Sequence, residues 1–149
     1  MSGQRMNYGR SPATQPLAAL HRYSNQSGLD PKLRELVRTR VSQINGCAFC
    51  IDMHTKDARA EGETEQRLYA LSAWRETPFF SDRERAALEW AECLTLISQN
   101  DVSDELYERV HAQFPGDELI DLSMLVVEIN SWNRLAIPFR SVAGSYKRP

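Results

Sequence analysis

Apolar residues recur at helical spacing through most of the chain. Between Asp30-Pro31 and Asn45-Gly46 they stand three or four residues apart, at Leu33, Leu36, Val37, Val41 and Ile44. Aspartate is a favoured helix N-cap and proline is tolerated in the first turn, whereas Asn-Gly is typical of a helix end. The pattern therefore predicts one amphipathic helix that begins at Asp30-Pro31 and ends at Asn45-Gly46.

The same reasoning predicts helices along the rest of the chain. The last of them is apolar nearly all round, so we expect it to be buried on several sides. We find no βαβ pattern, which favours an all-α fold, a compact bundle of about six to seven helices. The segments expected beside the one above are 16–25, 47–60 closed by Gly62, 64–74, 81–97 with a Ser81/Glu84 capping box, 103 to before Pro115, and 117 to about 139.

Length and charge place the chain among ordinary one-domain proteins. It has 149 residues with 18 basic and 20 acidic side chains, and the two signs are interspersed along the sequence rather than gathered in blocks. We expect a flexible arm over residues 1–12 and a single helical domain over 13–149. The balanced charge argues against a nucleic-acid partner, and no segment is apolar enough for a membrane span or a signal peptide. We therefore expect a cytoplasmic protein.

The chemistry lies in a CxxC motif, Cys47 and Cys50, with His54 four residues later. On a helix that advances about 100° per residue, Cys50 lies about 60° and His54 about 20° from Cys47, so the three share one face. A break at Asn45-Gly46 places Cys47 in the first helical turn, where free backbone N–H groups and the helix dipole favour a thiolate. The thiolate is the reactive form of cysteine, and the motif indicates redox or nucleophilic chemistry.

Two other interpretations of these residues stay open. The cysteines and the histidine could be core residues, since cysteine behaves as a small apolar side chain. They could instead bind zinc, with Glu35 or His21 as a fourth ligand, although the chain offers no second Cys/His pair. We expect no resident metal and no cofactor, with at most substoichiometric zinc captured during purification.

The remaining candidates have weaker signals. Cys93 stands among apolar helical positions and is expected to be inert core. His21 and His111 have no partner nearby in the sequence, and we expect them to be structural or solvated. Glu35 precedes the cysteine helix, and a short connection would fold the two helices antiparallel and bring it beside His54. A carboxylate that orients an imidazole is typical of an activated nucleophile, but the pattern alone does not prefer Glu35 over Glu61.

At this level of detail the chain resembles the carboxymuconolactone decarboxylase superfamily, in its alkylhydroperoxidase D-like branch. The likeness runs from about Ala13 to Arg140, through SQINGCAFCIDMHTKDARAEGETEQRLYALSAWRETPFF and EINSWNRLAIPFR. The family pattern is a Glu, eleven residues, CxxC, three residues and a His. Glu35, Cys47, Cys50 and His54 fit that register without a gap. The decarboxylase branch lacks the cysteine pair, so lactone decarboxylation is not expected here.

The resemblance implies an enzyme, a thiol-dependent peroxidase that reduces hydroperoxides. It implies that Cys50 attacks the peroxide, that Cys47 resolves the sulfenic acid as a disulfide, and that Glu35 and His54 form the proton relay. It further implies an external dithiol reductant as partner and a homo-trimer or homo-hexamer, for which the apolar last helix independently argues. Phe49 stands where the best-studied type has a histidine, so one half of a two-histidine relay is missing from the motif. The alternatives are a redox sensor or disulfide exchanger, or a small binding module with a zinc-capable Cys/Cys/His face.

Overall fold

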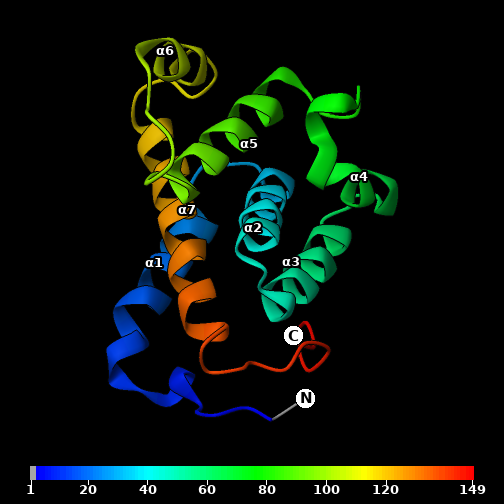
Figure 1. The fold of residues 1–149 in the computed structure, drawn as a ribbon, viewed down its shortest axis with the longest axis vertical. Coiled ribbons are helices and arrows are strands. Elements are labelled where there is room, and N and C mark those ends of the chain that lie inside the picture. The colour runs from blue at the N-terminus through cyan, green and yellow to red at the C-terminus, as the bar shows by residue number, and fades with distance from the viewer. Residues whose placement is uncertain (1–2) are drawn as a thin grey trace.

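The computed structural model describes residues 3–149, and their regular secondary structure is helical (Figure 1). Over this described range three short 3-10 helices accompany seven α-helices, so the expected all-α bundle is confirmed. The 3-10 helices are η1 (Tyr8–Arg10), η2 (Pro12–Thr14) and η3 (Leu71–Glu76). The α-helices are α1 (Gln15–Gln26), α2 (Pro31–Asn45), α3 (Ala48–Ala60), α4 (Glu65–Ala70), α5 (Asp82–Thr95), α6 (Asp104–Gln113) and α7 (Asp117–Ala136).

Helix α2 begins and ends where the sequence signals place its boundaries. The Asp30 side chain accepts a hydrogen bond from the Leu33 backbone N–H at 3.0 Å, which satisfies one of the free donors of the first turn. Gly46 closes the helix in the left-handed region, at φ +72°. A side chain is disfavoured there, so this glycine lets the backbone turn directly from α2 into α3.

Helix α2 lies at the centre of the bundle and packs against α3, α5 and α7, while α1 packs along α7 (Figure 1). Because the turn at Gly46 is short, α2 and α3 run antiparallel side by side. The larger core cluster joins α2, α5 and α7 and contains both cysteines of the CxxC motif. A second, smaller core lies between α2 and the segment from α3 to α5; it comprises Leu36, Ala58, Leu68, Leu71, Trp74, Phe80 and Leu88.

Three helix boundaries differ from the sequence expectation. The segment predicted as one helix over 64–74 is α4 followed by η3, with a kink at Ala73, whose φ of −120° and ψ of 32° are not helical. The helix expected to reach Ile97 ends at Thr95, and the last helix ends at Ala136 before Pro138 rather than near Phe139. A proline cannot donate to the helical ladder and restricts the residue before it, which favours an early end.

The N-terminal segment contacts the end of α7. The backbone N–H of Arg5 donates to the carbonyl of Phe139 at 3.0 Å, and the Tyr8 ring lies 5.8 Å from the Phe139 ring centroid. Residues 1–2 of the expected arm lie outside the described part, and flexibility over 1–12 stays a prediction. Within residues 3–149, no helix has the length and apolar character needed to cross a bilayer.

Candidate functional site

The two cysteines of the motif lie at the start of α3. Cys47 is the N-cap of this helix rather than a residue of its first turn, and its Sγ accepts a hydrogen bond from the Cys50 backbone N–H at 3.3 Å. The two residues form a disulfide with Cα atoms 5.3 Å apart, and both are buried. The N-cap position still lies at the positive end of the α3 dipole, although the sequence pattern predicts Cys47 one position further along, in the first turn.

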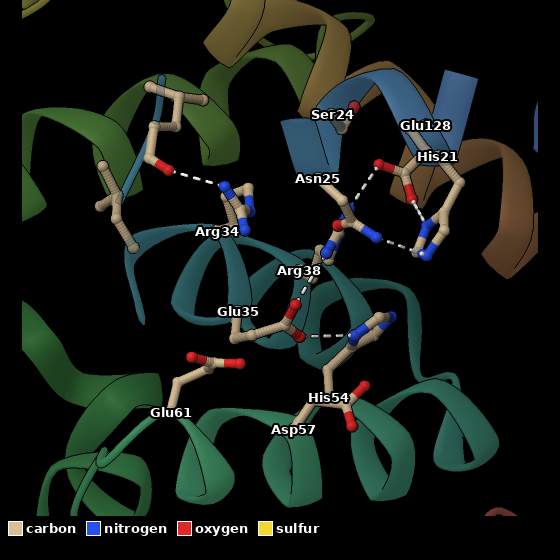
Figure 2. Close-up of polar contacts among 12 residues, drawn as sticks. His21, Ser24, Asn25, Arg34, Glu35, Arg38, His54, Asp57, Glu61 and Glu128 are labelled. Carbon is tan, nitrogen blue, oxygen red and sulfur yellow. Dashed lines mark hydrogen bonds and ion pairs between the residues drawn. The ribbon is translucent and has the colours of Figure 1, made fainter. Parts of the chain in front are cut away.

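His54 lies one helical turn beyond Cys50 and is held by Glu35 of α2. The His54 Nδ1–H donates to Glu35 Oε2 at 2.8 Å, with both side chains buried (Figure 2). The expected antiparallel pairing of the two helices thus selects Glu35. Glu61, the other carboxylate considered, lies near the end of α3 and accepts from Arg148 instead.

Glu35 belongs to a larger buried ion network. Arg38, one turn along α2, donates to Glu35 Oε1 at 2.7 Å and to Glu128 Oε2 of α7 at 3.0 Å (Figure 2). Burial acts to raise the pKa of each carboxyl group, but the neighbouring histidines and the shared guanidinium outweigh it, and the pKa of both Glu35 and Glu128 is lowered. Both carboxylates are therefore ionised at neutral pH.

His21 has a buried carboxylate partner that lies far from it in the sequence. Its Nδ1 lies 2.6 Å from Glu128 Oε1, a residue 107 positions away in the sequence, and its Nε2 lies 3.1 Å from the Asn25 side-chain amide. The carboxylate of Glu128 is fully buried, whereas the His21 side chain is 36% exposed. The arrangement repeats that of Glu35 and His54, and both carboxylates bind the same Arg38 (Figure 2).

The two cysteines face different cavities. Cys50 lines a cavity of about 220 Å³ together with both network histidines; its other lining residues are Tyr8, Phe49, Met53 and Trp132. Cys47 lines a second cavity of about 480 Å³, formed with the end of α7 and the segment that follows it. A small molecule in the first cavity would meet Cys50 beside two imidazoles, while the second cavity gives an approach to Cys47.

Sequence reasoning considered His21 only as a possible zinc ligand, and it missed Arg38 and Glu128 as members of the site. Signals for the last two are present in the sequence. Glu128 is a single carboxylate inside a nearly continuous apolar run of the last helix, and Arg38 directly follows the apolar pair Leu36-Val37, three positions after Glu35. Since a charge is rarely buried without a partner, each residue could have been predicted to belong to a buried ion pair. The sequence does not show that the two residues pair with each other.

The segment of the last helix that resembles the family fixes the end of α2. The Asn45 amide donates to the Oδ1 atoms of Asn130 and Asn133 at 3.0 and 2.9 Å, and Asn133 donates to Ser42. These bonds hold α7 against Ser42 and Asn45 in the last turn of α2, just before Cys47. Trp132 of the same segment lines the Cys50 cavity.

The atoms that could hold a metal ion do not include the cysteines. Within residues 3–149, side-chain ligand atoms of Glu35, His54 and Asp57 lie within 4.8 Å of one another. Each already has a protein partner, and Asp57 accepts from the Tyr146 hydroxyl at 2.9 Å. Cys93 is a free, buried cysteine of the larger core cluster, as expected for core, and burial raises the pKa of its thiol.

The C-terminal segment lies across α3 beside this group. Burial and the Asp57 carboxylate raise the pKa of Tyr146 to about 12. The backbone carbonyl of Tyr146 accepts from Lys56, and the backbone N–H of Gly144 donates to Asp52. Figure 1 shows this segment passing from the end of α7 to α3. It covers the outer side of the helix that carries the cysteines and His54.

Comparisons with known proteins find a matching family model and related sequences. The model of the carboxymuconolactone decarboxylase family matches residues 13–92. The uncharacterised protein YdfG of Bacillus subtilis is 51% identical over 126 residues, which are 85% of this chain and 86% of YdfG.

Solved structures share the fold. A protein of unknown function from Agrobacterium tumefaciens, described as a putative antioxidant defence protein AhpD, superposes with a TM-score of 0.91 at 39% identity, over 96% of this chain and 99% of its own. A peroxidase-related protein from Ralstonia eutropha, described as an alkylhydroperoxidase AhpD core, has a TM-score of 0.80 at 19% identity, over 92% of this chain and 73% of its own. At that identity the second likeness concerns the fold alone.

Proposed function

This chain belongs to the carboxymuconolactone decarboxylase family, in its alkylhydroperoxidase D-like branch, and we propose that it is a thiol-dependent peroxidase that reduces hydroperoxides through the Cys47/Cys50 pair. The observation that carries the proposal is the cavity in which Cys50 and His54 meet, with His54 held by the buried Glu35. A thiol beside an imidazole whose other nitrogen is fixed by a carboxylate is the arrangement of an activated nucleophile.

Cys50 is the attacking residue in this proposal because it lines the cavity with His54. His54 accepts the Cys50 thiol proton, and the thiolate attacks the terminal oxygen of the hydroperoxide. The S–O bond forms as the O–O bond breaks, which yields Cys50 sulfenic acid and an alcohol. The peroxide is thereby reduced by two electrons.

Cys47 resolves the sulfenic acid. Its thiol condenses with Cys50–SOH to form the disulfide and release water. The Cys50 backbone N–H and the α3 dipole stabilise a Cys47 thiolate, which makes Cys47 a good nucleophile here and a good leaving group later. An external dithiol then reduces the disulfide and completes the cycle.

The test is a stoichiometric peroxide pulse on the reduced protein. Trp132 lines the Cys50 cavity, so its fluorescence should report the reaction in a stopped-flow experiment, and mass spectrometry locates the product. We expect loss of two hydrogens between Cys47 and Cys50. Cys47→Ser should stop at a sulfenic acid on Cys50 that dimedone labels, and Cys50→Ser should not react. The matched control is Cys93→Ser, which removes the other buried cysteine and should retain the parent rate.

The relay is tested at the same site. His54→Ala should slow alkylation of Cys50 by iodoacetamide at neutral pH and reduce the peroxide rate by about 10²-fold or more. Glu35→Gln should act in the same direction but more weakly, because it removes the orienting charge and leaves the base. If both thiols of the parent stay alkylatable at the untreated rate after the pulse, the peroxidase proposal is wrong.

A disulfide-exchange role is the second candidate, and the cavity beside Cys47 favours it. That cavity is larger than the one at Cys50 and is bounded by the segment that follows α7. A protein thiol could reach Cys47 there without entering the Cys50 cavity. Rapid exchange with an aromatic disulfide probe, together with slow reaction with peroxides, would favour this role over peroxide reduction.

A further inference from the structure

Two carboxylate–histidine pairs meet at one cavity. His54 of α3 is held by Glu35, and His21 of α1 is held by Glu128, while both imidazoles line the cavity that contains Cys50. Figure 2 shows the two pairs on either side of Arg38, with the imidazole rings on the same side of the network. The proposed peroxidase step above uses only one of them.

The contacts of His21 assign a donor or acceptor role to each of its two ring nitrogens. Its Nδ1–H donates to Glu128 Oε1, and its Nε2 accepts from the Asn25 amide. Nε2 is therefore the nitrogen that can exchange a proton with another group. Asn25 is exposed, and rotation of its amide presents Oδ1 in place of the NH₂ group, so it can also accept from a protonated His21.

The buried carboxylates suit the two imidazoles to proton transfer. Glu35 and Glu128 are both buried, and they share the guanidinium of Arg38. Each of them also contacts one imidazole, at 2.8 Å for His54 and 2.6 Å for His21. A carboxylate in this position stabilises an imidazole that carries a proton, so either histidine has the partner that a proton donor or acceptor needs.

Position decides which histidine has which role. His54 is 4% exposed and lies one turn from Cys50 on the same helix, which suits it to accept the thiol proton. His21 comes from a different helix and its side chain is 36% exposed, so it can regain a proton from solvent after each turnover. It lines the same cavity as Cys50 but comes from α1, so its imidazole approaches that cavity from another element than the thiol and His54.

We propose that His21 is the general acid of the peroxide reaction, a role that rests on the proposed peroxidase function. As the Cys50 thiolate attacks the terminal oxygen of ROOH, the S–O bond forms, the O–O bond breaks, and the S–OH group keeps the peroxide hydrogen. His21 Nε2 gives its proton to the departing alkoxide, and ROH leaves. His54 holds the thiol proton during this step. Both histidines then return to their starting protonation by exchange with water.

The proposal makes a prediction that a structural role for His21 does not. A general acid matters when the leaving group is a strong base, such as tert-butoxide, and hardly at all when it is a weak base, such as acetate. The test therefore compares the rate at which tert-butyl hydroperoxide and peracetic acid each oxidise the reduced protein. The variant is His21→Gln, whose amide can still donate to Glu128, and the matched control is His111→Gln, which removes the remaining histidine of the chain from a position outside the cavity.

For His21→Gln we expect the rate with tert-butyl hydroperoxide to fall by about 10²-fold, and the rate with peracetic acid to stay within about threefold of the parent. Iodoacetamide should alkylate Cys50 at the parent rate, because His54 remains the base. His21→Ala should regain part of its rate with tert-butyl hydroperoxide when imidazole is added. His111→Gln should match the parent with both oxidants, and circular dichroism should show the parent fold for each variant.

Two results would overturn the role, and they are distinguishable. Should His21→Gln lose the same factor with both oxidants, or keep the parent rate with both, His21 is not a general acid while the peroxidase function stands. Should the parent itself form no Cys47–Cys50 disulfide with either oxidant, the peroxidase function fails and the role of His21 fails with it.

Discussion

Replacing Arg38 by methionine should destabilise the fold more than the loss of any exposed ion pair would. The guanidinium side chain is 1% exposed and contacts two carboxylates that are 9% and 0% exposed. Methionine keeps most of the length and apolar volume of the side chain but leaves Glu35 and Glu128 without their common cation. Removal of one partner from a buried pair costs about 3–5 kcal/mol, so we expect at least that loss in the free energy of unfolding. For a protein of this size, this lowers Tm by about 6–20 °C.

The matched control, Arg109→Met, tests whether the cost of losing the arginine comes from burial of the ion pair or from the length of its hydrogen bond. Arg109 donates to Glu89 at 2.9 Å, a bond as short as those of Arg38, but the two side chains are 57% and 34% exposed. Because water screens such a pair, Arg109→Met should cost about 0.2–1 kcal/mol. Urea unfolding of both variants, followed by circular dichroism, measures the difference. A further variant, Glu35→Gln with Arg38→Met and Glu128→Gln, removes all three charges and should be more stable than Arg38→Met alone.

The stability difference between the parent and Arg38→Met should change with pH in one direction. In the parent the pKa of both carboxyl groups lies below the ordinary value of 4.5, so their contribution to stability is full above that value and is lost as the pH falls through the lowered pKa. In Arg38→Met, burial without the cation raises the pKa of the same groups, and protonation relieves the buried charge. The stability difference should therefore be smaller at pH 5 than at pH 7. A difference below about 1 kcal/mol at pH 7, or one that grows towards pH 5, would refute this account of the network.

Three further predictions concern the turn before the cysteines, the C-terminal segment and assembly. Gly46→Ala places a side chain at φ +72° with no neighbouring atom within 4 Å, so we expect a purely backbone cost of about 1–2 kcal/mol. Gly28→Ala, at an equally open position without positive φ, should cost less in the same thermal melt, and equal losses would contradict the explanation. Ultraviolet titration should show one tyrosine ionising near pH 12 in the parent, because burial and Asp57 raise the pKa of Tyr146; the signal should vanish in Tyr146→Phe and move to lower pH in Asp57→Asn, and its persistence in Tyr146→Phe would assign it elsewhere. On α7, Ile120 and Val127 are 61% and 47% exposed, and we propose that this surface is covered in a homo-trimer or a homo-hexamer. Sedimentation should give that assembly for the parent and a smaller species for Val127→Lys, whereas a stable 17.0 kDa parent monomer would contradict it.

Local sequence signals predicted most helix ends, the position of the dithiol and the place of His54 on the same helix face. Helix caps and breaks act within a few residues, which is why Asp30 and Gly46 predict the ends of α2. The spacing of Cys47, Cys50 and His54 is set by helical geometry alone, and a short turn restricts Glu35 to the facing helix. The missed kink in the segment 64–74 has no such local signal, because nothing in its composition marks Ala73 as non-helical.

The pair of His21 and Glu128 depends on how the helices pack and has no signal in the sequence. Arg38 and Glu128 are 90 positions apart and His21 and Glu128 are 107 apart, so no periodicity relates them. They meet because α1 and α2 both pack on α7, and because a buried charge must find a partner wherever the fold provides one. A histidine that had no partner in the sequence thereby becomes the counterpart of His54 across the cavity of Cys50. Local rules describe each helix, whereas the pairing of buried charges depends on which helices lie side by side.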